Sequence, residues 1–158
     1  MDASVPTTPA TRPADGELRA VDRPTRVLRA LLVLGILESF VHYTDNTVRY
    51  DDYTASDPSL VGSLVTRPVI PISWVLFTVA AVIGYRRFRQ GRWPQAAAWI
   101  GAYSLSGLIS VFHYVDISPS DLSTFQNTFV FLDVLLGALI LGFAIWTALR
   151  APALPRRD

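Results

Sequence analysis

The chain contains no cysteine, no lysine and only two histidines among its 158 residues. The absence of cysteine excludes disulfide bonds, thiolate zinc sites and iron–sulfur ligation. All 14 cationic side chains are arginines, yet the formal net charge is only +1. Nucleic-acid binding needs cations clustered on one folded surface and interleaved with aromatic rings, so this balance predicts no nucleic-acid partner.

Charged residues make up only 17% of the chain and hydrophobic residues 51%, and four apolar runs are too long for an ordinary soluble core. These runs cover residues 27–43, 69–85, 96–114 and 129–149. A helix needs roughly 17–25 residues to cross the hydrocarbon of a bilayer. A soluble bundle would show a polar stripe on every helix, and the fourth run has almost none. The sequence therefore predicts an all-α integral membrane four-helix bundle surrounded by membrane lipids.

Arginines flank this bundle unevenly. They cluster before the first run, in the turn "RRFRQGR" at 86–92 and after the fourth run, whereas the two opposite loops are acidic. The positive-inside rule then predicts a multi-pass protein of the inner (cell) membrane with both termini cytoplasmic. Residues 1–26 show no signal-peptide pattern and predict a disordered cytoplasmic tail. Residues 27–150 form the predicted transmembrane domain, and residues 151–158 form a second cytoplasmic tail.

The two histidines occur in matching contexts. The sequence "HYTD" spans residues 42–45, and "HYVD" spans residues 113–116. Each unit falls at the outward end of a predicted helix, one on the first helix and one on the third. The match indicates two related helical hairpins, arranged about an axis along the membrane normal.

Ionisable side chains share faces of these helices, because residues three and four apart are neighbours on a helix surface. The stripes comprise Glu38, His42 and Asp45 on the first helix, and His113 and Asp116 on the third. The fourth helix adds Asp133 at about the same depth as Glu38. Two carboxylates at that depth cost of order 2.5 kcal/mol or more each, so we expect both to face the bundle interior.

We therefore expect a polar cavity that opens outward between the helices. Its floor would be formed by Glu38 and Asp133. Its rim would be formed by His42, Asp45, His113 and Asp116. Secondary members would be Tyr43, Asn46 and Tyr114.

The favoured interpretation of these residues is structural. Polar contacts between helices commonly hold membrane bundles together. The chain would then be a structural or accessory membrane subunit, with a membrane-protein partner or a second copy of itself. A transporter or channel subunit whose carboxylates relay protons is a further hypothesis, and it would need oligomers.

A second interpretation is a membrane enzyme that acts on a lipid. One divalent metal could be bound through two nitrogens and two oxygens, with ligands His42, Asp45, His113 and Asp116. Without a metal, protons would be moved by the catalytic candidates Glu38, His42, His113 and Asp133.

The order of helix, long loop, helix, basic turn and two helices resembles the layout of EXPERA-domain proteins, the sterol isomerase and sigma-2-receptor group. The likeness lies in this layout and in a histidine with acidic residues inside a small bundle. No motif is matched residue by residue. The resemblance implies a lipid-accessible pocket in this chain.

A third interpretation is an electron-transfer protein with haem b held between His42 and His113. Bis-histidine ligation across a membrane bundle would explain why the only two histidines stand in equivalent positions. Against it, Asp45 and Asp116 lie one turn away, at a rim that we expect to be wet.

Overall fold

The computed structural model describes residues 15–55 and 58–150, and over these residues it contains helices and no strand. The long helices among them are α1 (Asp15–Val48), α3 (Val69–Arg89), α4 (Trp93–Leu108) and α6 (Thr124–Arg150). The short elements are η1 (Tyr50–Tyr53), α2 (Leu60–Leu64), η2 (Ile109–Phe112) and α5 (His113–Asp116). The prediction of an all-α four-helix bundle is confirmed. Residues 1–14 of the predicted tail at 1–26, and the whole predicted tail at 151–158, lie outside the described residues.

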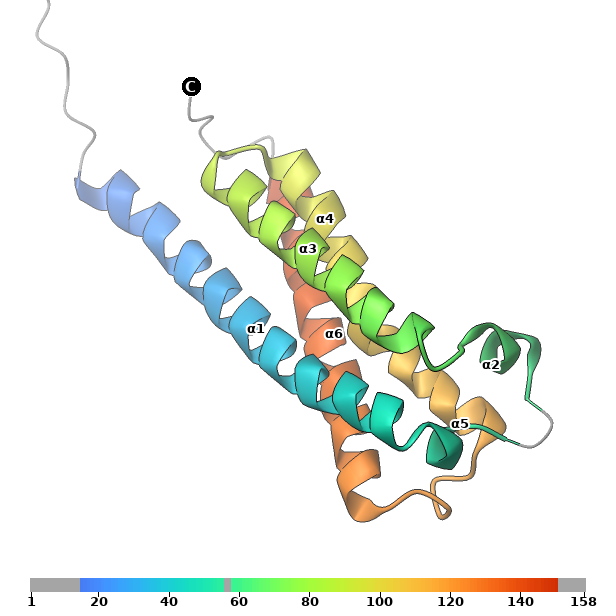
Figure 1. Cartoon of the computed structure of the whole chain (residues 1–158). Helices are drawn as coiled ribbons and strands as arrows, with labels where there is room; N and C mark the ends of the chain where they lie inside the picture. The colour runs from blue at the N-terminus through green and yellow to red at the C-terminus, as the bar shows by residue number, and fades with distance from the viewer. Residues whose placement is uncertain (1–14, 56–57, 151–158) are drawn as a thin grey trace, which may run out of the picture.

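The long helices form a ring in which each packs beside its neighbours (Figure 1). α3 packs between α1 and α4, and α6 closes the ring by packing against both α4 and α1. α1 and α4 barely touch, so they occupy opposite corners and run in the same direction. The described chain therefore begins and ends at one end of the bundle. The short elements η1, α2 and α5 lie at the other end, which we call the loop end (Figure 1).

α1 begins at Asp15, whereas the sequence analysis predicts a helix from residue 27 and disorder before it. The helix is longer because the preceding charged stretch is rich in helix formers such as Glu17 and Ala20. A stretch with no apolar face can still extend a helix that the following apolar run has nucleated, since each added residue contributes a backbone hydrogen bond. Pro24 lies inside this extension and removes one backbone donor from it.

The third predicted span is interrupted near the loop end. α4 stops at Leu108, the four residues of η2 follow, and the single turn α5 then carries His113 and Asp116. A 3₁₀-helix advances three residues per turn, so η2 turns the following side chains relative to a regular α-helix. This change of pitch decides where the second histidine and its aspartate point.

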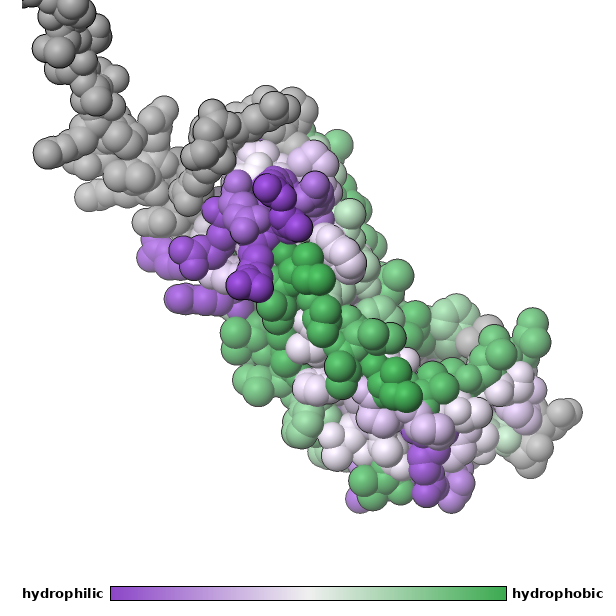
Figure 2. Space-filling model, turned by 45° about the horizontal axis from the view of Figure 1, so that its top comes forward, coloured by the Kyte–Doolittle hydropathy of each residue, from purple (hydrophilic) through white to green (hydrophobic). Residues whose placement is uncertain are grey.

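The outer surface of the long helices is apolar. Figure 2 shows a hydrophobic belt between a strongly hydrophilic end near the chain ends and a mixed surface at the other end. Large side chains in the belt, such as Leu37, Leu76 and Phe131, expose 61%, 65% and 64% of their surface. A continuous apolar surface of this kind is unfavourable in water and favourable in lipid. Four of the described helices are long and apolar enough to cross a membrane, which indicates a membrane protein.

Inside the bundle, apolar and polar side chains occupy different halves. The half nearest the chain ends holds an apolar core that includes Leu28, Phe88 and Ile100. The half nearest the loop end buries polar side chains, among them His42 and Asp133. The candidate site therefore lies in one half of a bundle whose other half is held by ordinary hydrophobic packing.

α4 and α6 meet backbone to backbone at Gly107 and Gly137. A Cβ atom placed on Gly107 would clash with the carbonyl oxygen of Asp133, and one placed on Gly137 would lie 2.9 Å from the carbonyl oxygen of Ser104. These neighbours are backbone atoms and cannot move aside without moving a helix. Small residues at a helix crossing allow such close approach in membranes.

We expect Gly137→Ala to destabilise the bundle by about 1–3 kcal/mol, because the added methyl group overpacks the α4–α6 contact. The matched control is Gly142→Ala on the same helix, where a Cβ would meet nothing within 4 Å. The control should be neutral or slightly stabilising, because alanine favours the helix. Thermal unfolding in detergent, followed by circular dichroism, compares the two variants. Equal midpoints would contradict the role of this contact.

Candidate functional site

Asp133 on α6 is the buried carboxyl group of the site. Only 2% of its surface is exposed, although its helix is otherwise strongly apolar. The Ser110 hydroxyl of η2 donates to Asp133 Oδ2 at 2.6 Å. The close approach of α4 and α6 at Gly107, one turn before Ser110, brings these two groups together. The expectation that Asp133 faces the interior agrees with this placement.

Glu38 approaches the same carboxyl group from α1. Its side chain is partly buried and interacts with Asp133, but neither of its oxygens makes a hydrogen bond. Two neighbouring carboxyl groups in an apolar bundle repel each other when both are ionised. The pair is therefore a place where a proton can be held between two helices.

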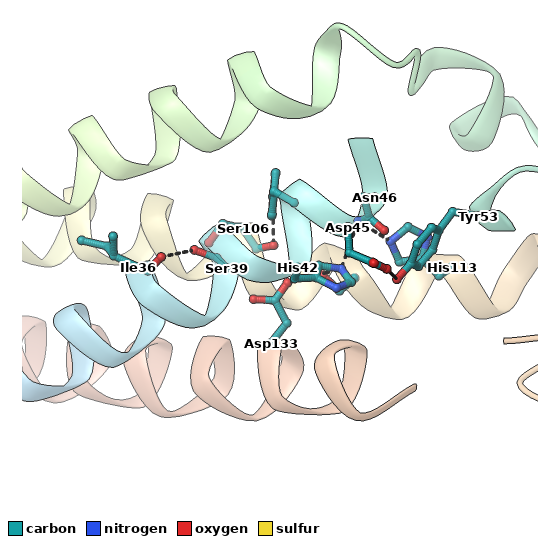
Figure 3. Close-up of polar contacts among 11 residues, drawn as sticks. Ile36, Ser39, His42, Asp45, Asn46, Tyr53, Ser106, His113 and Asp133 are labelled. Carbon is teal, nitrogen blue, oxygen red and sulfur yellow. Dashed lines mark hydrogen bonds and ion pairs between the residues drawn. The ribbon is translucent and has the colours of Figure 1, made fainter. Parts of the chain in front are cut away.

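His42 connects this pair to the loop end of the bundle. Its ring is fully buried, and its Nε2 atom lies 3.8 Å from Asp133 Oδ2 (Figure 3). The second histidine, His113 of α5, lies beside it with ring centroids 5.6 Å apart. The two histidines that the sequence repeat singles out thus come together from opposite corners of the bundle.

Asn46 bridges the two rings. Its Nδ2 atom lies 3.1 Å from His42 Nε2 and 3.3 Å from His113 Nε2. A side-chain amide has two N–H groups, so it can donate one to each imidazole. In that arrangement both rings are neutral and carry their proton on Nδ1. Asn46 is only a secondary member in the sequence analysis, yet it is the residue through which the histidines meet.

The two aspartates of the repeat accept hydrogen bonds from residues after α1 and not from the histidines. Asp45 accepts a hydrogen bond from the Tyr53 hydroxyl at 2.8 Å, and its carboxylate lies 3.4 Å from Arg49. Asp116 accepts from both the backbone N–H and the hydroxyl of Ser59, each at 3.0 Å. Both acids therefore hold the segment that joins α1 to α3. We call its described residues, 49–55 and 58–68, the outer segment.

The ligand set expected for a divalent metal is consequently not assembled. The expected ligands were His42, Asp45, His113 and Asp116. Over residues 15–55 and 58–150, no group of three or more His, Asp or Glu side chains is placed to hold a metal ion. The physical reason is that donors in the outer segment lie closer to the two aspartates than the imidazoles do.

The space between His42 and His113 does not suit haem b either. Bis-histidine ligation requires the iron and the plane of the macrocycle to pass between two facing nitrogen atoms. Here the Asn46 amide occupies the position between the two Nε2 atoms. The rings also meet edge to face, with 74° between their planes.

A cavity of about 240 Å³ opens beside this cluster, beneath the outer segment. Its wall is mostly apolar and is formed by the end of α1, the start of α3, η2 and the outer segment. Its lining residues include Asn46, Tyr53, Ile70, Ser110, Phe112 and His113. The expected rim residues His113 and Asp116 line it, whereas Glu38, His42, Asp45 and Asp133 lie outside its wall.

Tyr53 forms part of the cavity wall and covers the histidine pair. Its ring lies 4.8 Å from the His113 ring, centroid to centroid, and only 8% of the residue is exposed. Burial raises the pKa of the Tyr53 hydroxyl above its ordinary value, and the hydrogen bond and charge of Asp45 raise it further. The phenol therefore stays protonated and donates to Asp45 over the whole range in which a protein is normally studied.

Sequence reasoning missed Tyr53 and Ser59, which belong to one of the two acidic loops. A usable signal was present for Asn46. Glu38, His42 and Asn46 follow steps of four, so they share one face of α1.

Comparisons with known proteins give no relative for this arrangement. No protein-family model matches the chain, and no match is found among curated proteins or solved structures. The fold and the site together define an all-α membrane-type bundle with a bridged histidine pair beside an apolar cavity.

We expect Asp116→Ala to loosen the outer segment, because Ser59 loses both of its hydrogen bonds to the carboxylate. Amide hydrogen exchange in the segment 58–65 should accelerate about tenfold, as for the loss of a charged hydrogen bond. The control is Asp121→Ala, at an exposed position in the turn before α6. Exchange that is unchanged in Asp116→Ala would show that the carboxylate does not hold the segment.

Proposed function

We propose that the chain is a multi-pass protein of the cell membrane with both termini in the cytoplasm. The uneven distribution of arginines supports this orientation. The last turn of α3 carries Arg86, Arg87 and Arg89, and Arg92 precedes α4, whereas the loop end exposes Asp51 and Asp52. Cytoplasmic loops of membrane proteins carry the excess of basic residues. The loop end and its cavity would then face the outside of the cell.

The orientation can be tested directly, because the chain has no cysteine. We expect a membrane-impermeant maleimide to label Ser120→Cys, at the loop end, in intact cells. Gln90→Cys, in the arginine-rich turn, should be labelled only after permeabilisation. The opposite pattern would overturn the proposed orientation.

Within this orientation, we propose that the protein binds a small, largely apolar molecule in the cavity beneath the outer segment. The single observation that carries this proposal is the cavity itself, an apolar space with His113, Asn46 and Ser110 gathered on one wall. Binding sites for small molecules commonly combine an apolar wall with a few converging polar groups. An engineered apolar cavity of about 150 Å³ holds one benzene. The present cavity suits a compact ring system, or one end of a lipid.

The polar wall supports acid–base chemistry on such a molecule. His113 lines the cavity, and Asn46, His42 and Asp133 follow behind it in one chain of polar contacts. An imidazole that faces a bound molecule is placed to act on it as a general acid or base. The Asp133–Glu38 pair lies on the other side of His42, where its two carboxyl groups can share a separate proton. This arrangement favours the lipid-directed interpretation over metal or haem chemistry.

The cavity is tested with adamantane carrying a diazirine group, a compact apolar photolabel. We expect the label to modify the peptide that contains Tyr50 and Tyr53, and Ser73→Phe to abolish this modification by filling the cavity. The matched control is Ile72→Phe, the adjacent exposed position, which does not line the cavity. Labelling of that peptide should persist in the control. Equal labelling in both variants would overturn the proposal.

A structural or accessory role remains the second candidate, and one observation favours it. The buried polar residues join three helices of the same chain, because Asp133 of α6, His42 of α1 and His113 of α5 form one connected cluster. Interhelical polar contacts of this kind stabilise membrane bundles without any ligand. The photolabel separates the two roles, because a purely structural cluster predicts no saturable labelling beneath the outer segment.

A further inference from the structure

The carbonyl oxygen of the Asn46 side chain has no hydrogen-bond partner among the described residues of the protein. Only 5% of this residue is exposed, and its Nδ2 atom is occupied by the two histidines. Its Oδ1 atom is buried and has no hydrogen-bond partner. Buried polar atoms without a partner are rare and costly, so each one points to a missing group. Asn46 lines the cavity, so an occupant of the cavity can supply the missing partner.

The charge of the cavity wall limits what that occupant can be. None of the described residues that line it is an arginine, so no fixed cation is available to a carboxylate or a phosphate. Among the described residues of the wall, Asp116 is the only acidic one, and both of its oxygens accept hydrogen bonds from Ser59. An ammonium group at this carboxylate would have to share both oxygens with Ser59 and give up its hydration in a mostly apolar space.

We infer that the occupant is a neutral alcohol with a compact apolar body, whose hydroxyl group donates to Asn46 Oδ1. This inference rests on the proposed binding function and names the chemical class of the ligand. A hydroxyl group both donates and accepts. It therefore satisfies Asn46 with either end of the amide turned toward the cavity, which an ether or a ketone cannot do. The apolar body would lie against Ile70 and Phe112 of the wall.

The inference is tested with one molecular cage that carries four different head groups. Adamantane, 1-adamantanol, 1-adamantanecarboxylate and 1-adamantanammonium compete with the adamantane diazirine for labelling of the full chain in lipid nanodiscs. Competition is compared at equal concentration in the membrane phase. We expect 1-adamantanol to compete about tenfold more strongly than adamantane, as for one hydrogen bond to a buried group. The two charged compounds should compete less well than adamantane.

Asn46→Leu keeps the approximate size of the side chain and removes the amide. In this variant the advantage of the alcohol over the hydrocarbon should disappear while labelling itself persists. The matched control is Thr54→Val, because Thr54 lines the same cavity but its hydroxyl is already bonded to the carbonyl oxygen of Tyr50. The control should keep the advantage of the alcohol. If Asn46→Leu does not fold, the four competitors still test the inference on the natural chain.

The outcomes separate this inference from the function on which it rests. Labelling beneath the outer segment that no cage compound reduces would overturn the binding function itself. Saturable labelling, with the carboxylate, the ammonium or the bare hydrocarbon competing as well as the alcohol, would leave the binding function standing. It would overturn only the assignment of an alcohol.

Discussion

The close contact between α4 and α6 is the constraint on which the polar site depends. Gly107 lies one turn before Ser110, and Gly137 lies one turn after Asp133, so the backbone contact sets the register of both polar residues. A larger residue at either glycine would move the helices apart. Ser110 would then no longer reach the carboxyl group at 2.6 Å. Because His42 lies against the same carboxyl group, the position of the whole cluster follows from this crossing.

The two His-Tyr-x-Asp units place their histidine and their aspartate in the same way on two helices. In each unit the histidine turns into the bundle, and the aspartate three residues later turns to the outer segment. Asp45 binds Tyr53, and Asp116 binds Ser59. The repeat thus places two imidazoles inside the bundle and two carboxylates over it. This division explains why the chain needs both residue types at that spacing without any metal joining them.

The sequence was sufficient for the parts of the structure that depend on apolar periodicity. Long apolar runs predict the four helices, and the cost of a carboxylate in lipid predicts that Asp133 turns inward. The site was harder to predict where it depends on contacts distant in sequence. The partners of Asp45 and Asp116 lie in an acidic loop, and the folding of this loop back over the bundle leaves no periodic signal in the sequence. η2 also breaks the regular α-helical spacing on which the predicted positions of His113 and Asp116 depend.

Asn46 couples the buried histidine pair to the cavity, because it contacts both histidines and lines the cavity. Hydrogen bonds that share one group strengthen each other in a low-dielectric interior. A new hydrogen bond to the amide oxygen therefore also changes the strength of the bonds that the amide N–H groups donate. One end is held by two imidazoles, behind which lies Asp133, and the opposite, open end, in a residue that lines the cavity, has no hydrogen-bond partner among the described residues. A molecule that satisfies the open end therefore also fixes the orientation of the amide, and with it the tautomer of both histidines. Occupancy of the cavity and the protonation pattern of the buried cluster are in this way linked through a single side chain.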